Sequence, residues 1–323
     1  MSIQPAPSVP PPPVPSAARP PRRRPSQLLR AAKGPLWIDL HVHSTASDGT
    51  DPPDQLVRRA HALGLDVIAL TDHDSFAGLA AAGAAAEAVG LELMPGLELS
   101  AHHGPAHGPD SRPVHLLGYG CRPDHPELTA ELKLIRRSRR ERTPKLLEQL
   151  AGLGFELDLA EVEAQAGSAA AVGRPHLADA MVARGQVVDR DQAFALYLGD
   201  DGPVRADRHT PTAARAVDLI RAAGGCAVLA HPWARGAEAW ISPAWLAQLT
   251  QHGLFGLEVD HVDHSADQRR RLRQLADRLG LAVTSSSDYH GRGRKGHPLG
   301  AERTDPAVYA VLRQRLVDQK GRL

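Results

Sequence analysis

The chain has 323 residues, of which 42% are hydrophobic and only 4% are aromatic, so a core built mainly from Ala, Leu and Val is expected. Its 38 Lys and Arg residues are balanced by 37 Asp and Glu residues, which argues against a general nucleic-acid or membrane binder. Any recognition of phosphate must therefore be local.

Residues 1–35 are predicted to form a disordered tail. This segment holds 11 of the 27 prolines and a basic run, Arg22–Arg24, but almost no large apolar residues that could offset the entropy of ordering. The basic run is not followed by the apolar region of an export signal, and no stretch approaches the ~18 apolar residues of a membrane span. We therefore expect a cytoplasmic protein that makes no membrane contact.

From Leu36 onward, short apolar stretches alternate with segments of helical pattern. The predicted strands are Leu36–Leu40, Leu65–Leu70, Leu91–Met94, Val114–Tyr119, Cys226–Leu229, Phe255–Val259 and Leu281–Ser285. The predicted helices between them are Pro52–Leu63, Phe76–Val89, Ala213–Ala223 and Ala266–Leu279. This repeating order of strand and helix predicts an α/β fold with a parallel sheet.

Residues 124–207 interrupt this order, because they predict helices only. These helices are Glu127–Leu150, Leu159–Gln165, Pro175–Ala183 and Asp191–Leu198. Since strand–helix units resume afterwards, we interpret the segment as a helical insertion that caps the substrate site. The barrel would then consist of residues 36–123 and 208–305, and residues 306–323 would form a C-terminal helix.

Four clusters rich in His and acid follow apolar stretches. They are His41-Val42-His43 with Asp48, Thr71-Asp72-His73-Asp74, Ala230-His231-Pro232 and Ser287-Asp288-Tyr289-His290. Because parallel strands of a barrel end at one edge, these side chains are expected to meet there. Residues two apart on a strand, such as His41 and His43, face the same side. Imidazoles with a few carboxylates suit Zn, Mn or Fe better than Mg or Ca, so a multinuclear metal site is predicted.

Each part of this pattern also has a purely structural interpretation. Asp48 could be a turn residue, Asp74 could cap a helix, and His115 could be a satisfied histidine of the core. Glu98 lies between apolar residues of a strand, where a carboxylate is uncommon unless it is paired or bound to metal. The prediction of a metal site therefore depends on all of these residues occurring together near strand ends, and not on any one of them.

Taken in order, these residues resemble the polymerase-and-histidinol-phosphatase (PHP) family of phosphoesterases, from Ile38 to about Gly300. The motif Gly173-Arg174-Pro175-His176 and the long helical insertion resemble the subgroup that hydrolyses nucleoside 3′,5′-bisphosphates. Members of that subgroup also trim short RNA or DNA from the 5′ end. The resemblance implies a distorted (β/α)7 barrel with a trinuclear metal site.

The resemblance carries nine metal ligands over to this chain. They are His41, His43, Asp48, His73, Glu98, His115, His231, Asp288 and His290. The first ion would take His41, His43, Glu98 and Asp288, the second would share Glu98 and use His115 and His231, and the third would take Asp48, His73 and His290. Three divalent cations are expected, Mn before Zn or Fe. The residues expected to take part in catalysis are Asp48, His73, His231, Asp288 and His290.

Three divalent ions would outweigh the charge of their three carboxylates. The remaining positive charge could bind a phosphate dianion and activate a water molecule, so our mechanistic hypothesis is in-line attack of a metal-activated hydroxide on phosphorus.

Two residues of the insertion are expected to bind substrate. Arg174 offers a permanently charged, bidentate fork for a non-reacting phosphate, although it could also be a surface residue beside a helix start. His176 could add a donor to the same phosphate. The basic run Arg136–Arg142 is either a solvated helix face or a grip on a nucleotide backbone. Val204-Arg205-Ala206 departs from the subgroup pattern, and this departure concerns substrate preference rather than metal binding.

The sequence therefore predicts a metal-dependent phosphoesterase. Its expected substrate is the 3′-phosphate of a nucleoside 3′,5′-bisphosphate, or the 5′ end of a short oligonucleotide. One alternative is a phosphatase for a non-nucleotide phosphomonoester such as histidinol phosphate. Another is a non-catalytic, metal-stabilised accessory module. No stable protein partner is expected.

Overall fold

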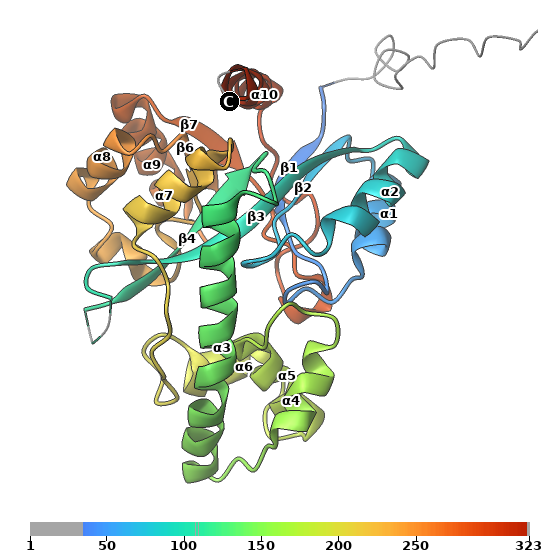
Figure 1. Ribbon diagram of the computed structural model, residues 1–323, viewed down its shortest axis with the longest axis vertical. Helices are drawn as coiled ribbons and strands as arrows, with labels where there is room; N and C mark the ends of the chain where they lie inside the picture. Colours follow the sequence, from blue (N-terminus) through green and yellow to red (C-terminus); the bar gives the residue numbers. More distant parts are fainter. Residues whose placement is uncertain (1–34, 107, 109, 322–323) are drawn as a thin grey trace, which may run out of the picture. The chain divides into compact units, whose positions relative to one another are not determined.

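The computed structural model of the chain describes residues 35–106, 108 and 110–321 (Figure 1). Apart from Pro35, the predicted tail lies outside the described residues. Seven strands form one sheet whose spatial order follows the chain. They are β1 (Ile38–Val42), β2 (Val67–Leu70), β3 (Glu92–His103), β4 (Arg112–Tyr119), β5 (Cys226–Leu229), β6 (Gly256–Asp260) and β7 (Ala282–Ser285). The sheet is curved into a nearly closed barrel, and a bridge between Val42 and Tyr289 joins its first and last parts.

The direction of β4 differs from the predicted parallel sheet. Strands β1 to β3 are parallel, as are β5 to β7, but β4 runs antiparallel to both β3 and β5. The physical reason is the short connection between His103 and Arg112, since a parallel crossover needs a dozen or more residues. The chain therefore turns straight back as a hairpin, and β3 becomes a twelve-residue strand that carries Glu98.

Alternating side chains of the strands pack on opposite faces of the sheet. In β2, Val67 and Ala69 point into the barrel core, whereas Ile68 and Leu70 pack against the outer helices. The helices around the sheet are α1 (Pro53–Ala62), α2 (Leu79–Val89), α7 (Ala213–Ala222), α8 (Pro243–Gln251), α9 (Ala266–Leu279) and α10 (Pro306–Lys320). Of these, α8 was not predicted. Helix α10 packs its Tyr309 and Leu312 onto the barrel core at one end of the sheet (Figure 1).

Helices fill the chain between β4 and β5, next to the opposite end of the barrel (Figure 1). They are α3 (Pro126–Gly152), α4 (Leu159–Ala166), α5 (Arg174–Ala183), α6 (Arg190–Ala193) and the π-helix η2 (Phe194–Leu198), after which α7 packs against the sheet. The predicted helix 191–198 is thus a short α-helix followed by a π-helix, a form often found at functional sites.

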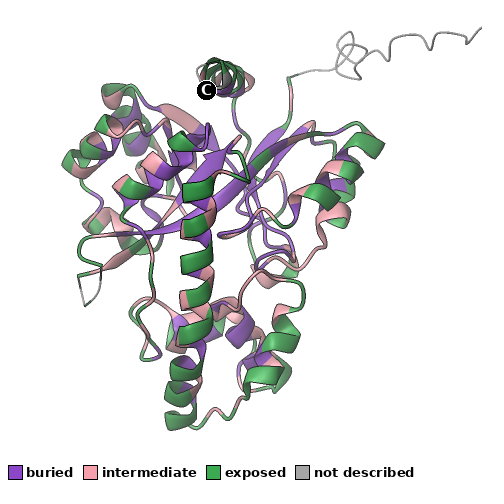
Figure 2. Ribbon diagram, viewed as in Figure 1, coloured by how far each residue is buried: buried purple, intermediate pink, exposed green. Residues whose placement is uncertain are grey.

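Helix α3 belongs to two hydrophobic cores. Leu132 and Ile135 in its first half pack against the barrel, whereas Leu146 and Leu150 in its second half pack against the other insertion helices. Figure 2 shows the buried residues concentrated on the strands and at the strand ends that face the insertion. In the described part of the chain, no helix is long and apolar enough to cross a membrane.

Candidate metal centre

The nine predicted ligands come from six strands or the segments that follow them, and lie together beside the insertion. His41 and Glu98 belong to β1 and β3, and His115 belongs to β4. The others follow the ends of β1, β2, β5 and β7: His43, Asp48, His73, His231, Asp288 and His290. Most of these side chains are buried, which is unusual for so many ionisable groups unless they are paired or bind metal.

The most enclosed group consists of His41, His43, Glu98 and Asp288. The Nε2 atoms of the two histidines are 3.0 Å apart, and each lies 3.1–3.4 Å from one oxygen of Glu98 and one oxygen of Asp288. Donors bound ~2.1 Å from a common ion would lie roughly 3.0–3.4 Å from one another. This spacing therefore fits a single cation between them.

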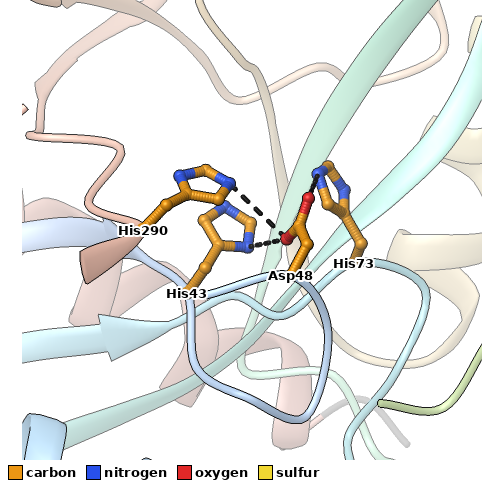
Figure 3. A group of neighbouring side chains, drawn as sticks. All are labelled: His43, Asp48, His73 and His290. Carbon is orange, nitrogen blue, oxygen red and sulfur yellow. Dashed lines mark ion pairs between the residues drawn. The ribbon is translucent and has the colours of Figure 1, made fainter. Parts of the chain in front are cut away.

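A second group, here called the Asp48 group, contains His43, Asp48, His73 and His290. Figure 3 shows the three imidazole rings directed at the Asp48 carboxylate. The ring nitrogens are 3.5–3.7 Å from the Asp48 oxygens. His43 thus belongs to two groups, whereas the sequence assigned it to one.

Glu98 is shared between neighbouring groups. Its Oε2 atom lies 3.2 Å from His73 Nδ1, and its Oε1 atom lies 2.8 Å from His115 Nδ1 and 3.2 Å from His231 Nε2. Burial raises the pKa of Glu98, but His73, His115 and His41 outweigh burial and hold this pKa well below its usual range. The carboxylate is therefore ionised and available to more than one cation.

Two orphaned nitrogens test whether metal ions fit this centre. The Nδ1 atoms of His73 and His115 are buried and have no hydrogen-bond partner among the described residues, although both lie close to Glu98. A buried polar atom without a partner is costly, and a cation between imidazole and carboxylate would satisfy it. The imidazole and carboxylate donors also suit Zn, Mn or Fe. The residues present therefore fit divalent metal ions.

Glu258 supports the centre and was not recognised in the sequence. One of its oxygens lies 2.9 Å from His41 Nδ1, so the opposite ring nitrogen is directed into the site. Its other oxygen accepts the backbone N–H of His231 at 2.7 Å. The sequence signal was the one used for Glu98, a carboxylate inside an apolar strand, Gly256-Leu257-Glu258-Val259.

The backbone is strained where the ligands leave their strands. Among the described residues, four that are not glycine have a positive φ, and two of them are the predicted ligands His231 (29°) and Asp288 (52°). A third, Asp74 (51°), follows the predicted ligand His73. Such conformations are uncommon for residues with a Cβ and persist where the surrounding structure holds them, often at functional sites.

The outer oxygen of Asp288 is held by residues that the sequence did not single out as a group. His261 Nε2 lies 3.3 Å from this oxygen, and Arg294 donates a hydrogen bond to it. Arg294 also forms an ion pair of 2.5 Å with Asp263, which in turn contacts His297. The sequence left open whether Arg294 reaches substrate from its loop; in the structure its guanidinium contacts Asp288, and the residue also lines a cavity beside the metal centre.

A cavity of about 680 Å³ opens beside the metal centre and is lined by many basic residues. Several arginines line this cavity, and four of them are here called the arginine wall: Arg139, Arg142 and Arg174 of the insertion and Arg208 of the loop after it. Arg139 and Arg142 come from the basic run of α3, so part of that run faces the cavity. Exposed Arg137, by contrast, pairs with Glu141 on the helix surface.

Two members of the arginine wall are engaged by protein groups. Arg174 donates to the Leu198 carbonyl at 2.8 Å and to Asp200 at 2.9 Å, and Arg139 forms an ion pair of 2.6 Å with Asp74. Their position is therefore fixed, but part of their charge is already compensated.

The other two members are less well satisfied. The Nη1 atom of Arg208 is buried without a hydrogen-bond partner among the described residues. Burial, together with Arg139, lowers the pKa of Arg208 to about 9. Burial and the neighbouring Arg208, Arg139 and Arg174 lower the pKa of Arg142 well below its usual range. An anion bound among these groups would compensate their buried charges and reduce the repulsion between them.

His176 does not occupy the predicted position of a phosphate donor. Its Nδ1 atom accepts the backbone N–H of Gly173 at 3.0 Å, so Nε2 carries the proton and donates to the Ser47 carbonyl at 3.0 Å. Both ring nitrogens are thus already used, and the assignment of His176 to phosphate needs correction. The ring ties α5 to the loop that carries Asp48.

Comparisons with known proteins agree with this geometry. The sequence pattern of the PHP domain matches residues 39–161. A 5′-3′ exoribonuclease of Haemophilus influenzae is 34% identical over 78% of this chain and 89% of its own length. A 3′,5′-nucleoside bisphosphate phosphatase of Chromobacterium violaceum is 33% identical over 84% of this chain and 93% of its own length.

Two solved structures are similar to this chain over most of its length. A candidate metal-dependent phosphoesterase from Bifidobacterium adolescentis superposes with a TM-score of 0.80 at 33% identity, covering 87% of this chain and 98% of that one. A protein described as an amidohydrolase from Chromobacterium violaceum, with bound sulfate, superposes with a TM-score of 0.76 at 32% identity and covers 87% of this chain and 97% of that one.

Proposed function

The chain belongs to the PHP family of metal-dependent phosphoesterases, as its motifs predicted, and we propose that it hydrolyses a nucleotide that carries a second phosphate. The substrate that the site fits best is a nucleoside 3′,5′-bisphosphate, of which the 3′-phosphate is removed. The observation that carries this proposal is the arginine wall, because its guanidinium groups line the same cavity as residues of the metal centre and those of Arg208 and Arg142 are poorly compensated.

The nine predicted ligands would hold the cations. We assign His41, His43, Glu98 and Asp288 to one ion, Glu98 with His115 and His231 to a second, and the Asp48 group to a third, with Mn as the expected metal. Divalent ions bound there would polarise the phosphoryl group and lower the pKa of a water molecule.

The chain's own residues set the geometry of the reaction. Glu258 orients His41, and Arg294 with His261 fixes the carboxylate of Asp288, so the centre is rigid before substrate arrives. The cavity of about 680 Å³ is of the size that encloses a small-molecule ligand.

The arginine wall would bind the phosphate that does not react. Guanidinium groups bind phosphate oxygens in pairs of parallel hydrogen bonds, and such charge-assisted bonds are about twice as strong as neutral ones. Arg208 and Arg142 have the most to gain, since burial and repulsion leave their charges poorly compensated. A nucleotide anchored in this way would present its other phosphate to the metal centre.

The 5′ end of a short oligonucleotide is a second candidate substrate for the same site. It is favoured by the likeness to the Haemophilus influenzae 5′-3′ exoribonuclease over most of both chains. A 5′-terminal phosphate offers the arginine wall the same oxygen atoms as the second phosphate of a bisphosphate.

A matched pair of substrates tests the proposal. In Mn²⁺ buffer, kcat/KM for a nucleoside 3′,5′-bisphosphate is expected to exceed that for the nucleoside 3′-monophosphate at least ~10-fold, because a charge-assisted contact contributes ~1.5–3 kcal/mol. Histidinol phosphate and a short RNA with a 5′-phosphate complete the panel. Equal rates on all four compounds would overturn the assignment of substrate, and no hydrolysis of any of them would favour the accessory-module alternative.

A further inference from the structure

The loop that carries Asp48 leaves β1 as a tight turn. Within the turn, the N–H groups of Ser47 and Gly49 both donate to the carbonyl of Ser44, at 3.1 and 3.0 Å. The carbonyl oxygens of residues 45–48 face away from this turn and accept hydrogen bonds from elsewhere in the chain. The donors that bind these carbonyl oxygens therefore determine how firmly the loop and its Asp48 are held.

All four of these carbonyls are satisfied by the insertion. Thr45 O accepts from Ser168 Oγ (3.1 Å), Ala46 O from Ala170 N (3.1 Å), Ser47 O from His176 Nε2 (3.0 Å), and Asp48 O from Arg190 Nη1 (2.9 Å). The donors follow the same order along the chain as the acceptors. The loop therefore lies along the insertion as a strip with one contact per residue.

The two side chains nearest to Asp48 are themselves fixed. His176 is buried, and its Nδ1 contact with Gly173 leaves only Nε2–H to meet the loop. Arg190 forms a bidentate ion pair with Asp179 at 2.6 and 2.5 Å, which aims its remaining nitrogen at Asp48 O. Both donors are thus preorganised before the loop is engaged.

Arg190 also packs against the second loop of the Asp48 group. A Cβ atom placed at Gly293, three residues after His290, would lie 2.2 Å from Arg190 Nη1, so the guanidinium packs closely on this loop. Lys295 adds an ion pair of 2.7 Å with Asp189, the residue next to Arg190. The insertion therefore holds both loops from which Asp48 and His290 come.

His73 of the same group is next to Asp74, which Arg136 and Arg139 of α3 contact. The ligands of the other two proposed sites are supported by residues outside the insertion. Glu258 on β6 orients His41 and the backbone of His231, while His261 and Arg294 fix Asp288. The contacts with the insertion thus concentrate on one of the three proposed cation sites.

We propose that the helical insertion completes the cation site of the Asp48 group, and that His176 and Arg190 are its positioning residues. This inference rests on the metal sites of the proposed function. The insertion is then a structural part of the metal centre as well as a wall of the substrate cavity.

The test compares Mn²⁺ binding by the full-length chain and its variants after removal of metal with a chelator. Bound Mn per chain is measured by atomic emission over a range of free Mn²⁺, and folding is followed by thermal melting. H176A and R190A are expected to bind one ion about 10-fold more weakly than the wild type and the other ions equally well. A ~10-fold loss is the lower end of the range for residues that support a metal ligand. D48A should lose the same ion.

R184A is the matched control, because Arg184 ends the same helix as His176 but pairs with Glu161 on the surface. Its binding curve should equal that of the wild type. H176Q, whose amide can still donate to Ser47 O, should recover most of the lost affinity. Hydrolysis by H176A and R190A should return at high Mn²⁺, since the residues act on occupancy and not on the reaction.

Three outcomes would overturn the inference. The first is that H176A and R190A bind every ion as tightly as R184A does, and the second is that the affinity for all ions falls together. The third is that H176A fails to fold while S168A binds every ion as the wild type does. Ser168 is exposed and makes one contact to the loop, so S168A is expected to fold and to weaken the same ion by a smaller factor. A wild type that binds no metal would instead overturn the proposed function itself.

Discussion

Replacing Arg208 by Met should make the protein more stable and at the same time a poorer enzyme for bisphosphates. In the free protein Arg208 is a source of repulsion, since it lies among other guanidinium groups and its Nη1 atom has no hydrogen-bond partner among the described residues. With substrate bound, the same charge would meet a phosphate. R208M removes both the repulsion in the free protein and the contact with the phosphate of the substrate. The first effect is measured as stability and the second as activity.

Both magnitudes can be estimated from these contacts. An unsatisfied buried donor costs ~1–3 kcal/mol, so the free energy of unfolding should rise by about 1 kcal/mol and the melting temperature by about 2 °C. A charge-assisted hydrogen bond contributes ~1.5–3 kcal/mol, so kcat/KM for a nucleoside 3′,5′-bisphosphate should fall by about 10- to 100-fold. The nucleoside 3′-monophosphate, which lacks the second phosphate, should change by less than ~3-fold.

The assay is a thermal melt of the chain and steady-state hydrolysis of both substrates in Mn²⁺ buffer. R184M is the control and should change neither quantity, because Arg184 forms a surface ion pair away from the cavity. A lower melting temperature for R208M, or an equal loss of activity on both substrates, would refute the reasoning.

Two further predictions concern metal binding. E258Q should weaken Mn²⁺ binding by ~10- to 100-fold. Glu258 accepts hydrogen bonds from the His41 ring and from the His231 N–H with its two oxygens, whereas an amide has a single acceptor oxygen. Unchanged binding in a Mn²⁺ titration would contradict this prediction. Burial lowers the pKa of His43, but hydrogen bonds to Asp288 and Glu98 raise it to about 10 in the metal-free chain, so at pH 7.5 Mn²⁺ must displace a proton. Affinity should therefore rise with pH between ~6.5 and 10, and calorimetry in two buffers of different ionisation enthalpy should show at least one proton released.

The sequence predicted those features that depend on local pattern. Apolar stretches located six of the seven strands to within a few residues, whereas β3 extends nine residues beyond the predicted Leu91–Met94. The positions of His41, His73 and Asp288 at or just after strand ends brought their side chains to one edge. Helices that end at glycine, such as those before Gly90 and Gly280, were also located well, because these residues adopt the left-handed conformation that stops a helix.

Features that depend on partners distant in sequence were not predicted. The direction of β4 follows from the length of a hairpin whose strands extend further than their apolar cores suggest. The role of His176 depends on Ser47, 129 residues away, and no local pattern reveals that contact. Arg208 had no signal, since it lies in an irregular segment after the insertion helices. The domain bounds and the cytoplasmic location stay predictions.

The order of the strands in the sheet has a consequence for how the protein is made. Because spatial order follows chain order, each strand can add to the growing edge as it leaves the ribosome. The bridge between Val42 and Tyr289 can form only after β7 and Tyr289 have been synthesised, and Asp288 and His290 lie on either side of Tyr289. A polypeptide interrupted before β7 would therefore lack Asp288 and His290, two predicted ligands of the metal centre, and should not hydrolyse phosphoesters.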